Sequence, residues 1–230
     1  MRRHILMFLF CATLAACGGK PSSAPAADHP AAAEESDVTT TPVAAGPSIV
    51  MLGDSLTAGF NLPAGNALPA ALQRDFDAKG IEAKFINAGV SGDTSADGLQ
   101  RYDFSVAGVK PNMLVVALGA NDFLNGLPAD VPKKNLSAIL DKAKADHIPT
   151  VLLGVSIPGA SLGKREAAFA AIYPDLAKKY DVPYYPDMLG AIQGKPELLQ
   201  PDGLHPTEAG VEAMAAAITE FLEPLVKDLP

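Results

Sequence analysis

The sequence predicts an α/β fold in which helices cover both faces of a parallel sheet. Short apolar runs alternate along the chain with longer segments whose apolar residues recur at helical spacing. The apolar runs are nearly continuous, which is typical of strands buried on both faces. Strands that alternate with helices join through right-handed crossovers into one parallel sheet. With 48% of its 230 residues hydrophobic, the chain has enough apolar side chains for one full core.

The chain begins with a targeting segment rather than with part of this fold. Two arginines precede a short apolar stretch, residues 5–15, which is too short to span a bilayer. The stretch ends in Leu-Ala-Ala-Cys at residues 14–17, which resembles the lipobox of bacterial lipoproteins. The resemblance implies that residues 1–16 are a signal peptide and that Cys17 is acylated, which would anchor the protein to a membrane. An ordinary secretory signal, cleaved nearby, is the alternative.

A tether and a domain follow the cysteine. Residues 17–46 are rich in Ala, Pro, Ser and Thr and have no apolar periodicity, so we expect a disordered tether. The domain occupies residues 47–230. Gly18 follows the cysteine, where an aspartate would imply, by the same resemblance, retention in the inner membrane. We therefore expect the protein in the bacterial cell envelope, lipid-anchored to the outer membrane and facing the periplasm.

Strands and helices alternate through the domain. The predicted strands are residues 48–52, 83–87, 113–118, 150–155 and 182–186. The longer predicted helices are residues 67–79, 131–146, 164–180 and 207–226. The first of these helices stops at Gly80, since glycine is common at helix C-termini. Because proline interrupts the last strand, we expect that strand at an edge of the sheet.

The segment Gly53-Asp54-Ser55-Leu56 follows the first strand directly and precedes a helical stretch. Ser55 is therefore placed where a strand turns toward a helix, at the edge where parallel sheets bind ligands. Gly53 permits a tight turn, and the amides of the next turn favour developing negative charge. This position suits a nucleophile with part of an oxyanion hole, although the same residues also fit a strand-end turn without chemistry.

Three further polar segments are placed to reach the same edge. Residues 87–94 follow the second strand, residues 119–122 follow the third, and residues 202–206 precede the last helix. Because the carboxyl ends of parallel strands share one edge, Gly89 and Asn121 are expected to converge on the serine. The segment before the last helix can lie over that edge as well.

These residues fit nucleophilic catalysis by serine. A serine hydroxyl needs a base to take its proton, and His205 can be that base. Asp202, three residues earlier, can hold the imidazole in the required tautomer. The amides of Ser55 and Gly89 and the side chain of Asn121 can donate hydrogen bonds to an oxyanion.

The same segments also allow purely structural interpretations. Asn and Gly after a strand are commonly turn residues. Asp54 and Asp122 are expected to cap helices or turns rather than to take part in the chemistry. Asp93 and Thr94 are expected to start a helix, and His147 to end one. Because one histidine is placed for chemistry and both cysteines lie in the first 17 residues, no metal site is expected.

Together the four segments resemble the sequence blocks of the SGNH hydrolases, also called the GDSL lipase/esterase family. They occur in the family's order across about residues 48–220. The matching residues are the block I serine Ser55, the block II glycine Gly89, the block III asparagine Asn121, and Asp202 and His205 of block V. Residues 170–183 are further similar to a bacterial branch of arylesterases, acyl-CoA thioesterases and lysophospholipases. The resemblance implies a flavodoxin-like, three-layer α/β/α fold and no cofactor.

Apolar residues near these blocks suggest a pocket for an acyl or aryl group, although several of them could simply pack the core. The candidates are Leu56, Phe60, Phe123, Leu124, Ile157 and Pro158. Ala120 stands where close relatives in the family often have a second glycine, so its methyl group could crowd this pocket.

The sequence thus predicts a serine esterase that cleaves acyl esters or thioesters through an acyl-enzyme. Two other classes stay open, a carbohydrate O-deacetylase of envelope glycans and a non-catalytic envelope lipoprotein. The net charge of −8 and the pI of about 4.9 exclude the basic surface that nucleic-acid binding needs. The expected partners are a small-molecule substrate and the membrane, and the domain is expected to be a monomer.

Overall fold

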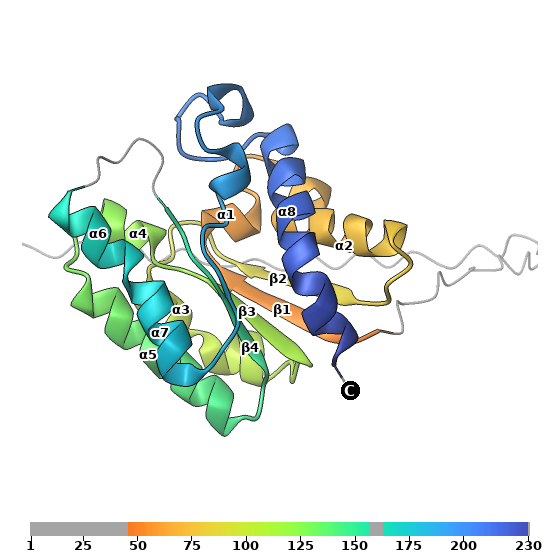
Figure 1. Ribbon diagram of the computed structural model, residues 1–230, viewed down its shortest axis with the longest axis horizontal. Helices are drawn as coiled ribbons and strands as arrows, with labels where there is room; N and C mark the ends of the chain where they lie inside the picture. Colours follow the sequence, from red (N-terminus) through yellow and green to blue (C-terminus); the bar gives the residue numbers. More distant parts are fainter. Residues whose placement is uncertain (1–45, 157–162, 230) are drawn as a thin grey trace, which may run out of the picture. The chain divides into compact units, whose positions relative to one another are not determined.

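A five-stranded parallel sheet forms the centre of the computed structural model, which describes residues 46–156 and 163–229 (Figure 1). Its strands pair in the order β2-β1-β3-β4-β5, and every pair is parallel. The strands are β1 (Ser48–Gly53), β2 (Lys84–Gly89), β3 (Met113–Ala117), β4 (Thr150–Leu153) and β5 (Tyr184–Tyr185). This is the strand order of flavodoxin-like sheets, so the predicted fold class is confirmed.

Helices cover both faces of this sheet (Figure 1). On one face lie α2 (Leu68–Ala78) and α8 (Glu208–Lys227), and on the other lie α3 (Ser95–Gln100), α5 (Asp130–Ala145) and α7 (Ile172–Tyr180). The remaining short helices are α1 (Ser55–Ala58), α4 (Ala120–Leu124), α6 (Lys164–Ala170), the π-helical turn Asp103–Ala107 and the 3-10 turns Ala64–Asn66, Gly190–Ile192 and Pro196–Leu198.

The central strand β1 explains why the apolar runs are continuous. Ile49 and Met51 are fully buried in the core that includes α2 and α8, whereas Val50 and Leu52 are fully buried in the core of α5 and α7. Successive side chains of a strand point to opposite faces, so a strand covered on both sides must be apolar at every position.

The structure departs from the predicted elements where proline intervenes. The single helix expected at residues 164–180 is two helices, α6 and α7, which meet at Ala171. Pro174 has no amide hydrogen for the carbonyl four residues earlier, so the helical hydrogen bonding is interrupted there. Pro183 and Pro186 flank β5, which is reduced to two residues at the edge of the sheet, as expected of a proline-bounded strand.

Two predicted helix boundaries are confirmed by their hydrogen bonds. Thr94 is the N-cap of α3, and it forms a capping box with Asp97. His147 follows α5 with a φ of 58°, and its amide donates to the carbonyl of Lys144. A left-handed residue just past the end is a common way to terminate a helix.

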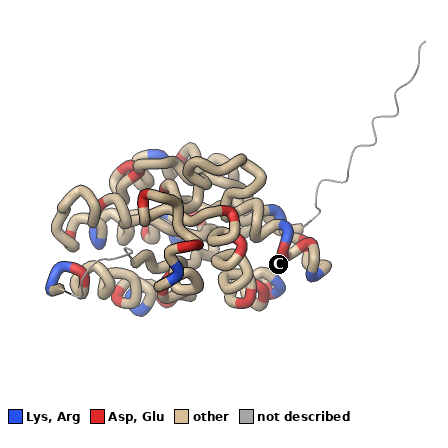
Figure 2. The backbone as a smooth tube through the Cα atoms, turned by 90° about the horizontal axis from the view of Figure 1, so that it is seen from above, with Lys and Arg blue, Asp and Glu red and all other residues tan. Residues whose placement is uncertain are grey.

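Acidic and basic residues are interspersed along the described backbone rather than gathered by sign (Figure 2). None of the helices in residues 46–156 and 163–229 is long and apolar enough to cross a membrane. The predicted signal peptide, the tether with Cys17, and the pocket candidates Ile157 and Pro158 lie outside the described residues.

Candidate active site

The strand order reverses between β1 and β3, and the polar segments meet there. Ser55 begins α1 directly after β1, and Asn121 lies in α4, which follows β3. Together with His205, from the loop before α8, they line a small cavity of about 50 Å³. Open α/β sheets bind ligands in the crevice at such a reversal, outside the carboxyl ends of the strands.

Ser55, His205 and Asp202 form a continuous series of hydrogen bonds. Ser55 Oγ lies 2.9 Å from His205 Nε2, and His205 Nδ1 lies 2.7 Å from Asp202 Oδ2. The second carboxylate oxygen, Oδ1, accepts the backbone amides of Leu204 at 2.9 Å and His205 at 3.0 Å. Asp202 thus holds both the imidazole and the backbone that carries it.

The ionised state of Asp202 fixes the tautomer of His205. Burial raises the pKa of Asp202, but the hydrogen bonds from the amides and imidazole outweigh it and lower the pKa to about 2. An ionised carboxylate only accepts hydrogen bonds, so Nδ1 of His205 carries the proton. Nε2 is then free to accept from the hydroxyl of Ser55, which is the arrangement that general-base catalysis requires.

Gln200 fastens the loop of His205 to the loop that follows α1. Its amide donates to the carbonyl of His205 at 2.7 Å. Its side-chain nitrogen donates to the carbonyls of Phe60 at 2.8 Å and Pro206 at 2.9 Å. The ring of Phe60 stacks on that of His205, with the centroids 4.3 Å apart and the planes at 33°. Two segments far apart in the sequence therefore fix the position of one imidazole.

The turn between β1 and α1 is crowded, and this crowding explains its sequence. A Cβ atom on Gly53 would lie 2.0 Å from Thr57 Oγ1, so no larger residue fits there. Asp54 caps α1 by accepting the amide of Leu56 at 3.0 Å, as predicted. The amide of Ser55 takes part in no hydrogen bond among the described residues, so it can serve an incoming oxyanion.

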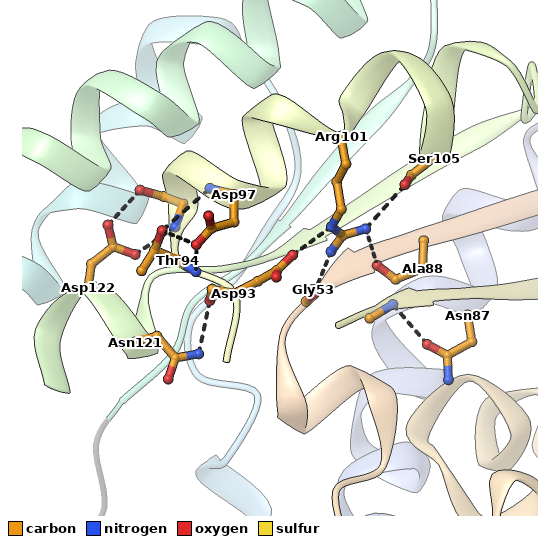
Figure 3. Close-up of polar contacts among 12 residues, drawn as sticks. Gly53, Asn87, Ala88, Asp93, Thr94, Asp97, Arg101, Ser105, Asn121 and Asp122 are labelled. Atoms are coloured by element: carbon orange, nitrogen blue, oxygen red, sulfur yellow. Dashed lines mark hydrogen bonds and ion pairs between the residues drawn. The ribbon is translucent and has the colours of Figure 1, made fainter. Parts of the chain in front are cut away.

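The amide of Gly89 does not fit the role expected of it. Gly89 is the last residue of β2, and its N–H donates to the side-chain oxygen of Asn87 at 2.9 Å (Figure 3). An amide has one hydrogen, so none is left for an oxyanion. A Cβ atom on Gly89 would lie 2.4 Å from the amide nitrogen of Ala58. This glycine is therefore required because β2 packs closely against α1.

Gly92, three residues further on, has the free amide that Gly89 lacks. It lies in the turn closed by the hydrogen bond from the amide of Asp93 to the carbonyl of Val90, and its φ is 91°. No hydrogen bond within the described part of the chain uses its N–H, and a Cβ atom there would meet nothing within 4 Å. In the sequence, this turn could have been recognised from the Ser91-Gly92 pair, because Ser-Gly pairs are common in turns.

Asn121 lies against this same turn. Its side-chain nitrogen donates to the carbonyl of Asp93 at 2.9 Å (Figure 3). A side-chain amide has two hydrogens, so one is left to donate elsewhere. Asn121 also lines the cavity that contains Ser55 and His205. The neighbouring Asp122 is buried and accepts the amide and hydroxyl of Ser95 at the start of α3, which is the capping role expected of it.

A second, larger cavity adjoins the first. Its volume is about 220 Å³, and both cavities are lined by Ala120 and Ser156. Of the expected pocket residues, Leu56 and Leu124 line the small cavity and Phe123 lines the large one. The other residues around the large cavity include Phe169, Tyr173, Tyr184, Glu166 and Gln193. Ala120 forms part of the wall that the two cavities share.

The chain resembles several characterised proteins over most of its length. The model of the GDSL-like lipase/acylhydrolase family matches residues 51–213. The chain is 37% identical over 184 residues to thioesterase 1/protease 1/lysophospholipase L1 of Escherichia coli (strain K12), covering 80% of this chain and 86% of that one. It is 32% identical over 192 residues to the esterase TesA of Pseudomonas aeruginosa, with coverage of 82% and 94%. The solved structure of AlinE4, an SGNH-hydrolase family esterase, matches with a TM-score of 0.65 and 40% identity over 79% of this chain and 97% of that one.

Proposed function

Because the chain belongs to the GDSL-like lipase/acylhydrolase family, we propose that Ser55, His205 and Asp202 carry out its hydrolytic reaction. The protein is a serine esterase, and its named relatives are esterases and thioesterases. The observation that carries the assignment is the 2.9 Å contact between Ser55 Oγ and His205 Nε2. The non-catalytic lipoprotein, one of the classes left open by the sequence, does not agree with this membership.

The reaction begins with attack on the acyl carbonyl. Nε2 of His205 takes the hydroxyl proton while Ser55 Oγ bonds to the carbonyl carbon, whose oxygen becomes the oxyanion. The imidazolium formed is stabilised by the Asp202 carboxylate, 2.7 Å from Nδ1. When the tetrahedral intermediate collapses, His205 gives the proton to the leaving alcohol or thiol and the acyl group stays on Ser55. Water, activated by the same histidine, then releases the acid.

The oxyanion is bound by three donors in this proposal. These are the amides of Ser55 and Gly92 and the side-chain nitrogen of Asn121. Gly92 replaces Gly89 because the amide of Gly89 is occupied by Asn87, whereas the amide of Gly92 is unoccupied beside Asn121. Losing one such donor typically lowers kcat by about 10² to 10³.

The acyl group extends into the larger cavity in this proposal. The two cavities share a wall, and Phe123, Phe169 and Tyr173 line the larger one. Its volume of about 220 Å³ is below the usual range for drug-sized ligands, so we infer that short to medium acyl chains fit best. Among the substrates that the name of the Escherichia coli relative indicates, thioesters and lysophospholipids with such acyl chains would fit this cavity.

The decisive experiment compares p-nitrophenyl acetate, butyrate, octanoate and palmitate as substrates. The wild-type protein should hydrolyse them, with an optimum below palmitate. Ser55→Ala should lose at least about 10³-fold in kcat/KM on each ester while remaining folded by circular dichroism. Ser137→Ala, on α5 and bonded to Tyr180 rather than to a histidine, is the matched control and should keep full activity.

The outcomes separate the alternatives. Full activity in Ser55→Ala would refute the assigned nucleophile. Hydrolysis limited to the acetate would favour the carbohydrate O-deacetylase. A flat profile across all four esters would argue against a shaped acyl pocket.

We also propose that the protein acts from a membrane, lipid-anchored through Cys17 to the outer membrane. The support is the lipobox-like pattern at residues 14–17 and the Ala/Pro/Ser-rich composition up to residue 46. Several acyl chains on one cysteine give firm membrane attachment, which a single chain does not. A tether of this composition would keep the esterase domain away from the lipid headgroups.

A further inference from the structure

Arg101, at the end of α3, connects four groups near the active site (Figure 3). Its Nε lies 2.6 Å from the carboxylate of Asp93. Its terminal nitrogens donate to the carbonyls of Ala88 at 2.7 Å and Gly53 at 2.8 Å, and to the hydroxyl of Ser105 at 3.3 Å. The side chains of Arg101 and Asp93 are only 18% and 12% exposed, so solvent screens this pair weakly.

The acceptors lie at the two strand ends beside the nucleophile. Gly53 is the last residue of β1, immediately before Asp54 and Ser55, and Ala88 is the penultimate residue of β2. Asp93 belongs to the turn that follows β2. One guanidinium therefore fixes the position of this turn relative to the strand that carries the nucleophile.

The same turn carries the proposed oxyanion donors. Gly92 is bonded directly to Asp93, and the carbonyl of Asp93 accepts the side chain of Asn121 at 2.9 Å. The carboxylate of Asp93 is held by Arg101, while its backbone touches Asn121. Displacement of Asp93 would therefore move the amide of Gly92 and the side chain of Asn121 together.

We propose that Arg101 is a positioning residue that aligns the oxyanion donors with Ser55 by holding the turn at residues 90–93. The inference rests on the proposed function, since it concerns the oxyanion site of the same reaction. Arginine is required because its planar fork serves a carboxylate and two carbonyls at once, which the single ammonium of lysine does not. A misplacement of about 1 Å in a catalytic group can lower the rate about 10²-fold.

The test replaces Arg101 and measures turnover per active site. In Arg101→Gln and Arg101→Lys, kcat on p-nitrophenyl butyrate should fall about 10- to 100-fold while KM stays within about 3-fold. Asp93→Asn should lower kcat by a smaller factor, again with little change in KM. This variant keeps the backbone contact with Asn121 and loses only the charge that faces Arg101. Arg74→Gln is the matched control, since Arg74 pairs with Glu212 and a backbone carbonyl on the surface. It should keep the wild-type kcat.

Two readouts separate positioning from loss of folded protein. The pre-steady-state burst of p-nitrophenol counts competent serines, and its amplitude should be unchanged per mole of protein in the Arg101 variants. A trifluoromethyl ketone forms a tetrahedral adduct with the serine, so its affinity should fall by the same factor as kcat/KM.

Each result decides the inference. An Arg101 variant with normal kcat per titrated serine would overturn it, as would a loss confined to the burst amplitude. If Arg101→Gln does not fold, Asp93→Asn is used instead, with kcat per titrated serine and the affinity for the trifluoromethyl ketone as the measurements. A wild-type protein without Ser55-dependent hydrolysis would instead refute the proposed function. An active wild type with unaffected Arg101 and Asp93 variants would refute the positioning role alone.

Discussion

Asp54, beside Ser55, is a buried carboxyl group with an incomplete set of hydrogen bonds. One oxygen accepts the amide of Leu56, whereas Oδ2 has no partner among the described residues. Burial raises the pKa of Asp54 to about 6, although the bond from Leu56 and the proximity of His205 oppose the shift. The native state therefore binds this proton more tightly than the unfolded chain. The stabilisation is complete below about pH 4 and is lost as the pH rises through about 6.

Asp54→Asn should remove this pH dependence. Asparagine keeps an oxygen for the amide of Leu56 but carries no charge. Raising the pKa of a carboxyl group by about two corresponds to about 3 kcal/mol of stability lost when the group ionises. The Asn variant avoids this loss, so it should be more stable than the wild type at pH 8. This gain in the free energy of unfolding should be roughly 1–3 kcal/mol larger at pH 8 than at pH 4.5. Urea denaturation at the two pH values measures it, with the exposed Asp77→Asn as control. An equal effect of the substitution at both pH values would contradict the raised pKa.

The sequence identifies the side chains of the proposed site better than its backbone amides. Ser55, Asp202 and His205 are identified by their chemistry and by the loops that carry them, and the structure brings these three together. Gly89 and Gly92 both follow β2, and a glycine contributes only its backbone. The difference between them lies in the direction of one N–H, which the side chain of Asn87 determines. Composition and spacing contain no such information.

At the scale of elements, the loop of His205 depends on its contact with the loop after α1. The side chain of Gln200 bonds to the carbonyls of Phe60 and Pro206, and it accepts from Asn61 at 3.5 Å. Phe60 in turn stacks on the imidazole. The position of the His205 imidazole is thus set jointly by two loops, and Gln200 is the side chain that links them.

Gln200→Ala should therefore impair catalysis beyond its effect on stability. We expect kcat to fall about 10-fold, since the imidazole loses its fixed distance to Ser55, and the unfolding free energy to fall by about 1–2 kcal/mol. The matched control is Gln73→Ala, which removes bonds to Ala83 and Phe85 far from the site. The Gln73→Ala variant should lose a similar amount of unfolding free energy and keep the wild-type kcat. Equal kcat in both variants at a temperature where both are folded would exclude the link.

Elements buried on both faces are predictable, and elements set by local packing are not. The apolar runs predicted β1, β3 and β4 within two residues at each end, because burial on both faces leaves few polar positions. The edge strand β2 was also predicted within two residues, although its Lys84 and Asn87 are exposed. By contrast, α4 and the π-helical turn Asp103–Ala107 have too few residues for a periodic pattern. The placement of α4, for example, depends on the contact of its Asp122 with Ser95, 27 positions away in the sequence.

At the scale of the whole molecule, the residues of the proposed reaction all belong to the described domain. Every group in the proposed reaction lies between β1 and α8, at one edge of one sheet. The flavodoxin-like order follows from the β-α alternation together with the family resemblance, since alternation alone leaves the order of the strands open. All residues named in the proposed reaction belong to the described part of the chain, so the role proposed for residues 1–45 concerns only where the chemistry takes place.

If Cys17 carries the proposed lipid anchor, removal of the anchor should leave catalysis unchanged. When the full chain is expressed in a bacterium with an outer membrane and supplied with an alkyne-tagged fatty acid, the wild-type protein should carry the tag and sediment with outer-membrane fractions. Cys17→Ser should lose both the tag and the attachment, because stable anchoring needs the acyl chains. Its kcat/KM on p-nitrophenyl butyrate, measured in the same detergent, should equal that of the wild type, since no catalytic group lies near Cys17 in the sequence.

The control Cys11→Ser, within the predicted signal peptide, should remain tagged and sediment normally. An untagged wild-type protein in the soluble periplasmic fraction would instead establish an ordinary secretory signal, and the esterase would then act on substrates free in the periplasm.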